Sequence, residues 1–250
     1  MLFDTHAHYD DEKFEYDRFQ VMENLPENGI AYAVNIGTNL ESSKLSVEYA
    51  EKFDHIYATV GFHPEFADKL DLDALRELAK HKKVVAIGEI GLDYYWEDNP
   101  AKEIQIDAFK KQMDLAKELD LPVSIHNRDA TGDITSVLLE KDHNKVIIHC
   151  CSVSLETAKI FVKKGYYISF AGPVSFKNAG KLKEVAAFVP DDLLLIETDA
   201  PYLTPHPFRG QRNDSTKVLY TAQALAEIRG VSLEEIEKIT FENAKRIYNI

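Results

Sequence analysis

The histidines of this chain are the residues whose types and spacing point most directly to chemistry. Five of the nine lie at or just beyond the ends of predicted strands, namely His6, His8, His63, His126 and His149. His6 and His8 are two residues apart, and side chains at positions i and i+2 of an extended segment point the same way. Both imidazoles can therefore reach one metal ion, and the pattern predicts a metal site near the start of the chain.

Two carboxylates occupy equivalent places at strand ends. Glu89 follows an apolar strand and is flanked by glycines, which permit close approach of other groups. A carboxylate there needs a positive partner and can bridge two ions, with a salt bridge to Arg or Lys as the alternative. Asp199 follows the last predicted strand, where it can bind a metal and accept a proton from water. Glu197, two residues earlier, is expected to orient other groups or to cap its strand.

Further ligands and a substrate group follow the fifth and sixth strands. His126 and His149 add nitrogen donors to the oxygens of Glu89, a combination that suits Zn²⁺ or Mn²⁺. Arg128 can hold a substrate anion through two parallel hydrogen bonds, with a surface salt bridge as the alternative. His63, which precedes a proline, is expected to act as an acid or to bind substrate rather than to hold a metal.

Two other segments carry groups suited to nucleic acid. Residues 94–96 (YYW) can either stack a base at the rim of a cleft or pack the loop after the fourth strand. Residues 209–213 place Arg209, Arg212 and Asn213 in one loop. This polar, cationic group can meet a phosphate, or it can remain a solvated loop.

Short apolar runs alternate with longer amphipathic stretches, and these elements must position the side chains named above. Strands are predicted at 2–5, 30–36, 56–60, 84–87, 122–125, 145–148, 166–169 and 193–196. Helices are predicted at 12–27, 41–52, 71–81, 101–119, 134–141, 155–164, 180–188, 217–229 and 233–247. The strands are apolar almost throughout, as in sheets buried on both faces. About eight strand–helix units in 250 residues predict an α/β chain, a (β/α)8 TIM barrel with its site at the C-terminal strand ends. The alternative, an open doubly wound sheet, usually has a glycine-rich first turn, where this chain has His-Ala-His.

Composition limits the classes of protein that the chain can be. It has 45% hydrophobic and 28% charged residues, which fits a globular protein, and 250 residues suit a single domain spanning 1–250. The net charge of −13 argues against a protein that coats nucleic acid or anionic membranes. No signal peptide or membrane span is expected, and the adjacent Cys150 and Cys151 do not form a disulfide scaffold. Reduced thiols favour a cytoplasmic protein.

Taken together, the motifs resemble the TatD family of metal-dependent deoxyribonucleases and related hydrolases. The matching pieces are DTHAH at 4–8, VGFHP at 60–64, GEIGLDY at 88–94, IHNRDA at 125–130, HCCS at 149–152, ETDAPYL at 197–203 and RGQRN at 209–213. Each is weakly specific alone, but the ordered set spans nearly the whole chain. The resemblance implies a barrel with two divalent ions, whether Zn, Mg or Mn.

The resemblance also implies roles for individual residues. His6, His8 and Asp199 would hold one ion, His126 and His149 the other, and Glu89 would bridge them; His63, Arg128, Arg212 and Asn213 would line or adjoin the substrate site. Hydrolysis of DNA from a 3′ end is the expected activity. Asp199, Glu89 and His63 are the expected catalytic residues, with water activated by the ions. DNA is the expected partner, bound locally, with no membrane and no obligate protein partner.

Two segments depart from the family pattern, and two other functions are alternatives. Cys151 and Val153 replace the family's usual Phe and Gly around the serine after strand six, and Asp214-Ser215 replaces Glu-Pro after RN. Related amidohydrolases often bridge their metals with a carboxylated lysine, where this chain has Glu89. An amidohydrolase or esterase acting on a small molecule or aminoacyl ester is the alternative. A third possibility is a non-catalytic metal-binding protein, against which the complete ligand set argues.

Overall fold

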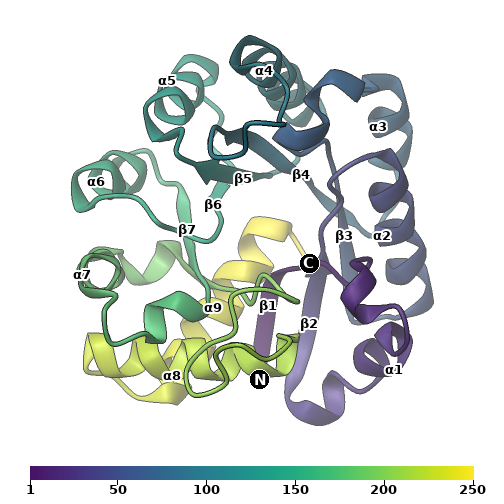
Figure 1. The fold of residues 1–250 in the computed structure, drawn as a ribbon. Coiled ribbons are helices and arrows are strands. Elements are labelled where there is room, and N and C mark those ends of the chain that lie inside the picture. Colours follow the sequence, from purple (N-terminus) through teal and green to yellow (C-terminus); the bar gives the residue numbers. More distant parts are fainter. The chain divides into compact units, whose positions relative to one another are not determined.

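Strands and helices alternate along the chain in the computed structural model, which describes every residue from Met1 to Ile250 (Figure 1). This alternation confirms the α/β class. Contacts divide the chain into two compact units. Unit 1 comprises Met1–Val34 and His149–Ile250, and unit 2 comprises Asn35–Ile148.

Unit 1 contains the first and last strands of the chain. Its strands are β1 (Leu2–Ala7), β2 (Ile30–Asn35, ending at the unit boundary), β7 (Tyr167–Phe170) and β8 (Leu194–Ile196). Its helices are α1 (Arg18–Glu23), α6 (Leu155–Lys163), α7 (Gly180–Phe188), α8 (Val218–Arg229) and α9 (Leu233–Tyr248). β7 pairs with β8 in parallel, and a parallel bridge joins Ala7 to Ala200. The end of β1 therefore lies beside the segment that follows β8.

Apolar packing in unit 1 fixes the strand that carries the first histidine. Every residue of β1, β7 and β8 is buried. The helices α8 and α9 contact β1 and β8 (Figure 1). The ring of Phe3 lies 5.9 Å from that of Tyr248, whose hydroxyl donates to the Thr5 carbonyl at 3.1 Å. Each large apolar side chain buried in this way contributes about 1.5–3 kcal/mol relative to an exposed one.

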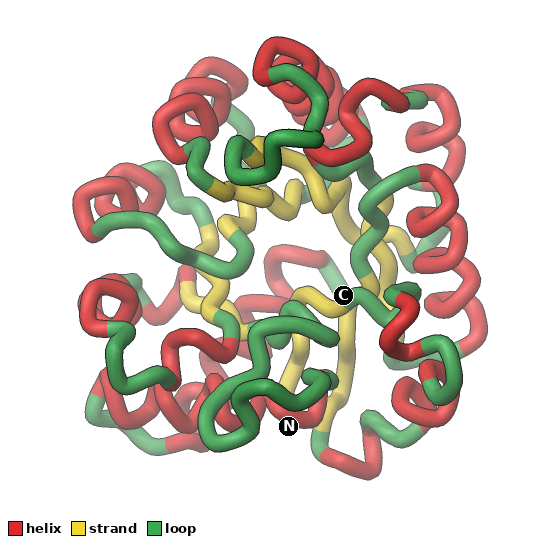
Figure 2. Tube along the Cα trace, in the orientation of Figure 1, coloured by secondary structure: helices red, strands yellow, loops and turns green.

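Unit 2 contains the middle of the chain. Its strands are β3 (Ile56–Val60), β4 (Val84–Asp93), β5 (Val123–Arg128) and β6 (Val146–Ile148). Its helices are α2 (Leu40–Lys52), α3 (Leu72–Leu78), α4 (Lys102–Glu118) and α5 (Thr131–Lys141). The strands pair in parallel in sequence order, from β3 to β6, and alternate with the helices, as the yellow and red segments of Figure 2 show.

The strand β4 is longer than the sequence predicts. Its predicted end is residue 87, but it continues to Asp93, and all ten residues are buried. The register with β5 shifts between Ile87 and Ile90 and then places Gly91 opposite His126. Gly91 has a φ of +142°, and a Cβ there would lie 2.1 Å from the His126 carbonyl oxygen. Glycine thus lets the two strands approach closely, and Glu89 lies within the strand rather than after it.

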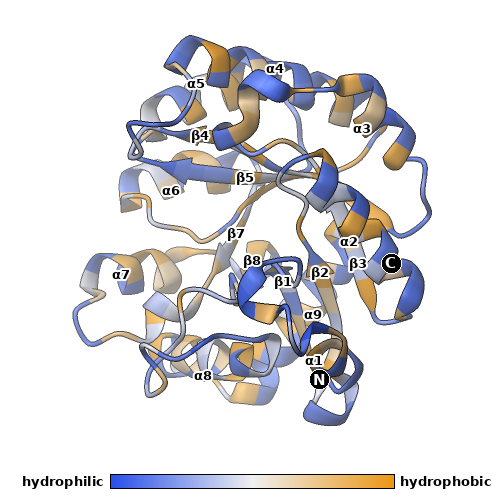
Figure 3. Ribbon diagram, turned by 45° about the vertical axis from the view of Figure 1, so that its right-hand side comes forward, coloured by the Kyte–Doolittle hydropathy of each residue, from blue (hydrophilic) through white to orange (hydrophobic).

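The helices of unit 2 carry mixed surfaces, with blue and orange stretches on α3 and α5 in Figure 3. In α4, Phe109, Met113 and Leu115 are buried. Ile104, by contrast, is 43% exposed. It lies in the first turn of the helix, and the buried apolar side chains begin one turn later. None of the helices in the chain combines the length and the hydropathy that a membrane span requires.

The helix predicted over residues 12–27 is mostly absent. Only α1 (Arg18–Glu23) is α-helical, between short 3-10 turns at Glu12–Phe14 and Pro26–Asn28. Asp17 adopts φ −141° and ψ 6°, which interrupts helical geometry before α1. Pro26 has no N–H to continue the helix after it. The other predicted helices overlap the observed ones, and Ser232 caps α9 by accepting the Glu235 N–H at 3.1 Å.

Candidate metal centre

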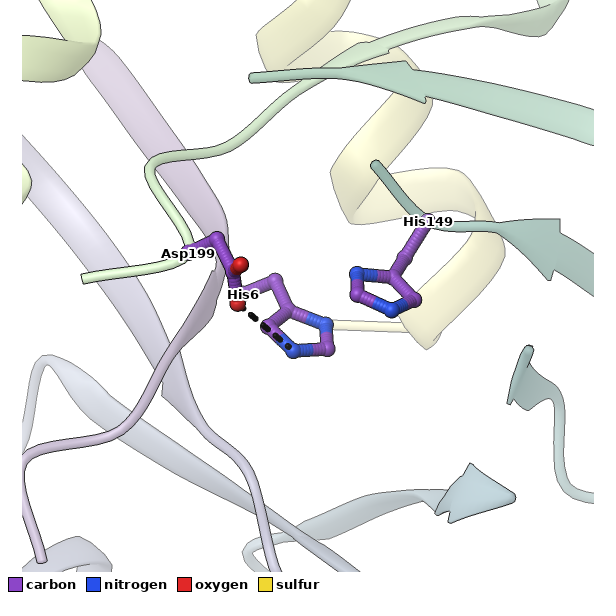
Figure 4. A group of neighbouring side chains, drawn as sticks. All are labelled: His6, His149 and Asp199. Atoms are coloured by element: carbon purple, nitrogen blue, oxygen red, sulfur yellow. Dashed lines mark ion pairs between the residues drawn. The ribbon is translucent and has the colours of Figure 1, made fainter. Parts of the chain in front are cut away.

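Four predicted site residues of unit 1 come together where β1 and β8 end and where the chain leaves β6. His6 Nε2 lies 3.1 Å from His8 Nε2, and Asp199 Oδ1 lies 3.6 Å from the first and 3.4 Å from the second. The imidazole of His149 stacks on that of His6, with centroids 4.0 Å apart and planes 7° apart. Figure 4 shows His6 and His149 side by side, with Asp199 at the edge of His6.

The spacing of these donors fits a metal ion. His6, His149 and Asp199 each place a ligand atom within 4.8 Å of the others. Ligands about 2.0–2.1 Å from one ion lie about 3.0–3.4 Å apart in octahedral or tetrahedral arrangements, close to the separations of the His6, His8 and Asp199 atoms. Asp199 has only histidines as ion-pair partners. Nitrogen and carboxylate donors of this kind suit Zn²⁺ and Mn²⁺.

The histidines favour the ionised form of Asp199. Burial alone would raise the pKa of its carboxyl group, but a hydrogen bond with His8 and the charges of His6, His8 and His149 outweigh it and lower that pKa. An ionised carboxylate is the form that binds a metal or accepts a proton. The negative charge of Asp199 therefore favours a cation among these donors.

Backbone hydrogen bonds hold Asp199 in an unusual conformation. Its φ is +54°, a left-handed value that costs a non-glycine residue about 1–2 kcal/mol. Its N–H donates to the His6 carbonyl at 2.9 Å, and its own carbonyl accepts the Tyr202 N–H at 2.9 Å. The buried Asp4 accepts the N–H and the hydroxyl of the preceding residue, Thr198, at 2.9 and 2.6 Å. Burial raises the pKa of Asp4 to about 7. These contacts fix Asp199 beside the end of β1.

Glu197 lies behind His149 and has no exposed surface. Its Oε1 is 3.3 Å from His149 Nδ1 and accepts the Cys150 N–H at 2.7 Å, whereas its Oε2 has no hydrogen-bond partner. A carboxylate at Nδ1 fixes the ring and leaves Nε2 to bind a metal. The expected orienting role therefore has a geometric basis, with His149 as the residue that Glu197 orients.

A second group forms in unit 2, on β4, on β5 and after β3. His126 Nδ1 lies 2.7 Å from Glu89 Oε1, and His126 Nε2 lies 3.1 Å from Asp93 Oδ2. The ring of His63 meets that of His126 edge to face at 4.4 Å. His63, Asp93 and His126 each place a ligand atom within 4.8 Å of the others. The structure thus gathers two predicted site residues, His63 and Glu89, and the unpredicted Asp93 around His126.

Asp93 is the residue that sequence reasoning missed. Burial alone would raise the pKa of its carboxyl group, but hydrogen bonds from His126 and the Tyr95 N–H, with the charges of His126 and His63, lower it. The sequence signal that could have identified Asp93 is its spacing from Glu89. Residues 89, 91 and 93 lie on one face of a strand, but the sequence predicts that this strand ends at residue 87.

The predicted substrate residues have different surroundings. Arg128 is exposed, and its guanidinium lies 4.1 Å from the Tyr95 ring centroid. Arg212 instead donates two hydrogen bonds to Asp17, at 2.7 and 2.6 Å. Asn213 is buried and donates to two backbone carbonyls, including that of Thr198 at 2.9 Å. The substrate roles of Arg212 and Asn213 and the bridging role of Glu89 stay predictions.

Known proteins resemble this chain over its full length. The family model of TatD-related DNases matches residues 3–249. The chain is 47% identical to "Uncharacterized metal-dependent hydrolase YabD" of Bacillus subtilis, over 100% of both chains. It is 34% identical to "Uncharacterized metal-dependent hydrolase YcfH" of Escherichia coli, covering 100% of this chain and 96% of the relative.

Solved structures agree with this assignment. The crystal structure of YjjV, a TatD homologue from Escherichia coli, has a TM-score of 0.93 and 31% identity, covering 100% of this chain and 98% of that chain. A TatD family hydrolase from Entamoeba histolytica, 24% identical, shares the fold with a TM-score of 0.90, covering 99% of this chain and 98% of that one. These likenesses confirm the predicted (β/α)8 TIM-barrel fold class. The chain belongs to the family of TatD-related DNases, as a metal-dependent hydrolase.

Proposed function

We propose that the protein is a deoxyribonuclease that hydrolyses phosphodiester bonds from the 3′ end of DNA. The family match supports DNA as the substrate class. The observation that carries the choice of a phosphodiester is the exposed guanidinium of Arg128, two residues beyond His126, which has no hydrogen bond or ion pair within the protein. Its forked N–H groups match the geometry of a phosphate.

We propose two divalent ions, of Zn, Mg or Mn, as the cofactors. The family resemblance assigns His6, His8 and Asp199 to one ion, His126 and His149 to the other, and Glu89 to both. The donor distances within unit 1 support the first of these assignments. When bound, such ions lower the pKa of water and offset the charge of a phosphodiester.

The protein's own residues then bind the substrate and move protons. Asp199, which its histidine neighbours keep ionised, accepts a proton from the attacking water. His63 Nδ1 accepts the Glu65 N–H at 3.2 Å, so a neutral ring carries its proton on Nε2. That N–H protonates the leaving oxygen or fixes the substrate. Arg128 donates to a non-bridging oxygen of the phosphodiester.

The proposed setting is the cytoplasm, with DNA bound locally. Neither cysteine forms a disulfide, and burial raises the pKa of Cys151 to about 12, so that it stays protonated. Free thiols suit a reducing compartment. With a net charge of −13, contact with DNA should depend on the ions and on a few arginines rather than on overall charge. The proposal needs no membrane and no obligate protein partner.

Metal reconstitution tests the proposal. Chelator-stripped protein is reloaded separately with Mg²⁺, Mn²⁺ or Zn²⁺ and assayed on a 5′-labelled single-stranded oligonucleotide and on ester and lactone substrates. We expect stepwise shortening of the oligonucleotide with at least one ion and loss of that activity in His6→Ala. His81→Ala is the matched control, because His81 pairs with Glu51 and with none of the proposed ligands.

The same assay separates the proposal from its alternative. Hydrolysis of esters or lactones, with no cleavage of DNA under any ion, would transfer the function to the amidohydrolase or esterase class. Absence of hydrolysis with every substrate and ion, despite bound metal, would favour a non-catalytic metal-binding protein. Either outcome overturns the nuclease proposal.

A further inference from the structure

An exposed aromatic pair stands next to Arg128 in unit 2. Tyr95 and Trp96 are 51% and 58% exposed, and their rings meet edge to face, 4.8 Å apart with planes at 88°. The guanidinium carbon of Arg128 lies 4.1 Å from the Tyr95 centroid and 5.6 Å from the Trp96 centroid. We call Tyr95, Trp96 and Arg128 together the YWR patch.

Core packing does not account for these side chains. Each ring leaves about half of its surface in water, where burial would stabilise the fold. The contact with Tyr95 restrains Arg128 by a cation–π interaction and consumes none of its hydrogen-bond donors. The patch therefore presents a flat aromatic surface and a cation whose five N–H donors have no acceptor in the protein.

Two short connections tie the YWR patch to the histidine group. Asp93 accepts the Tyr95 N–H on Oδ1 at 2.9 Å, while its Oδ2 faces His126 Nε2 at 3.1 Å. The β4–β5 register places Asp93 opposite Arg128, and the Tyr94 N–H donates to the Arg128 carbonyl at 3.0 Å. One carboxylate and one pair of strand ends thus hold the patch next to His126.

We propose that Trp96 stacks an unpaired base of single-stranded DNA, next to the phosphate that Arg128 holds. Tyr95 positions the guanidinium for that contact. The inference rests on the proposed function and narrows it to unpaired strands, because a base within a duplex is stacked on its neighbours and cannot lie on Trp96. Base–aromatic stacking is sequence-tolerant, since every base has a π-face, so no particular base is required.

Trp96 is the only tryptophan of the chain, so fluorescence excited selectively at tryptophan, at wavelengths longer than tyrosine absorbs, reports on this patch alone. The titration uses the metal-loaded, full-length Glu89→Gln protein, which the proposed function makes inactive, so the strand survives. The probes are a short oligothymidylate and an abasic strand of equal length, which carries the same phosphates without bases. We expect saturable quenching by oligothymidylate alone, and roughly tenfold weaker binding of the abasic strand by anisotropy. Equal affinity for both strands, or binding of oligothymidylate without quenching, would overturn the inference.

Kinetics on the active protein supplies the second arm. Trp96→Ala should raise KM for single-stranded DNA roughly tenfold with little change in kcat, and Trp96→Phe should retain most of the affinity. Tyr16→Ala is the matched control, because Tyr16 is an aromatic residue of unit 1 with 96% exposure. Unchanged KM in Trp96→Ala overturns the stacking role but leaves the nuclease proposal intact.

Two further results would also count against the inference. If sedimentation showed that Trp96→Ala dissociates an oligomer while KM stays unchanged, the patch would be a self-association surface instead. If neither strand bound and no DNA were cleaved under any ion, the proposed function itself would fail, and the stacking role with it. Cleavage of DNA without base-dependent quenching would remove the stacking role alone.

Discussion

The carboxylate of Asp93 lies at one edge of the His126 ring, with Oδ2 3.1 Å from Nε2, while Nδ1 of the same ring lies 2.7 Å from Glu89. A histidine that ligates through one nitrogen usually donates its other N–H to a carboxylate, which fixes the tautomer and raises ligand basicity. In the proposed metal site, Asp93 would therefore orient His126 so that Nδ1 is the nitrogen that binds the ion.

Replacing Asp93 should weaken metal binding without unfolding the protein. Asp93→Ala is expected to lower the affinity for a divalent ion about 10- to 100-fold by removing the partner of His126 Nε2. The metal affinity of Asp93→Asn should lie between those of wild type and Asp93→Ala, because its single acceptor oxygen cannot serve both His126 and the Tyr95 N–H. Chelator competition measures the affinity, and nitrogen chemical shifts in NMR report the His126 tautomer.

Asp133→Ala is the control for this experiment. Asp133 accepts the Tyr94 hydroxyl at 2.9 Å and pairs with Lys102, but it does not contact a histidine. Unchanged affinity and an unchanged His126 tautomer in both Asp93 variants would show that Asp93 serves only the backbone turn at Tyr95.

Glu197 should orient the His149 ring for metal binding, as Asp93 is expected to orient the His126 ring. Glu197→Ala removes the acceptor of the Cys150 N–H and is expected to lower the free energy of unfolding by about 1–3 kcal/mol. Metal affinity should fall about 10- to 100-fold as the His149 ring loosens. Glu197→Gln keeps one acceptor oxygen and should lose less affinity. Urea unfolding and chelator competition measure the two effects, and equal metal affinity in Glu197→Ala and wild type would contradict the orienting role.

Glu89 tests the bridging assignment. Glu89→Ala should reduce hydrolysis by about a hundredfold or more while leaving the fold intact, because the proposed site loses the carboxylate that serves both ions. Metal content by mass spectrometry, circular dichroism and oligonucleotide cleavage are measured on the same sample. Glu140→Ala is the control, since this exposed carboxylate pairs only with Lys110. Full activity with metal still bound would rule out the bridging role.

The site residues that could be predicted from the sequence follow from one rule of the fold, the convergence of C-terminal strand ends. His6, His8, His149 and Asp199 lie at or near the C-terminal ends of parallel strands, so an α/β alternation is enough to expect them together. The strands β1, β7 and β8 are largely apolar, and the structure buries every residue of them. No detail of packing was needed for these predictions.

The features that the sequence pattern failed to predict depend on contacts between segments far apart in the chain, which no local pattern encodes. Asp93 enters the group because β4 continues past a shift in register, stabilised by pairing with β5. The segment before α1 looks amphipathic, but Asp17 leaves the helical conformation and binds Arg212, 195 residues away. Tertiary pairing overrode helix propensity there, as it often does for short helices.

The Arg212–Asp17 pair gives a prediction with a defined pH dependence. Both nitrogens of the Arg212 fork donate to Asp17, which lowers the pKa of that carboxyl group. A folded-state pKa below the unfolded value near 3.9 means that the pair stabilises the protein above about pH 4. That stability is lost as the pH falls through the lower, folded-state pKa. Because both side chains are 35% exposed, the contribution at neutral pH should be only about 0.2–1 kcal/mol and should shrink in high salt.

Urea unfolding of wild type, Asp17→Asn, Arg212→Lys and the double variant tests this at neutral and acidic pH. Arg212→Lys should cost about as much as Asp17→Asn, since an ammonium cannot make the two parallel bonds. The double variant should cost little more than either single one, because both remove the same interaction. Additive losses would show that the two residues act independently. A different result would be a rise in KM for DNA in Arg212→Lys together with a fall in KM in Asp17→Asn. It would mean that Asp17 competes with the substrate phosphate for Arg212, because a guanidinium released from Asp17 binds phosphate more strongly.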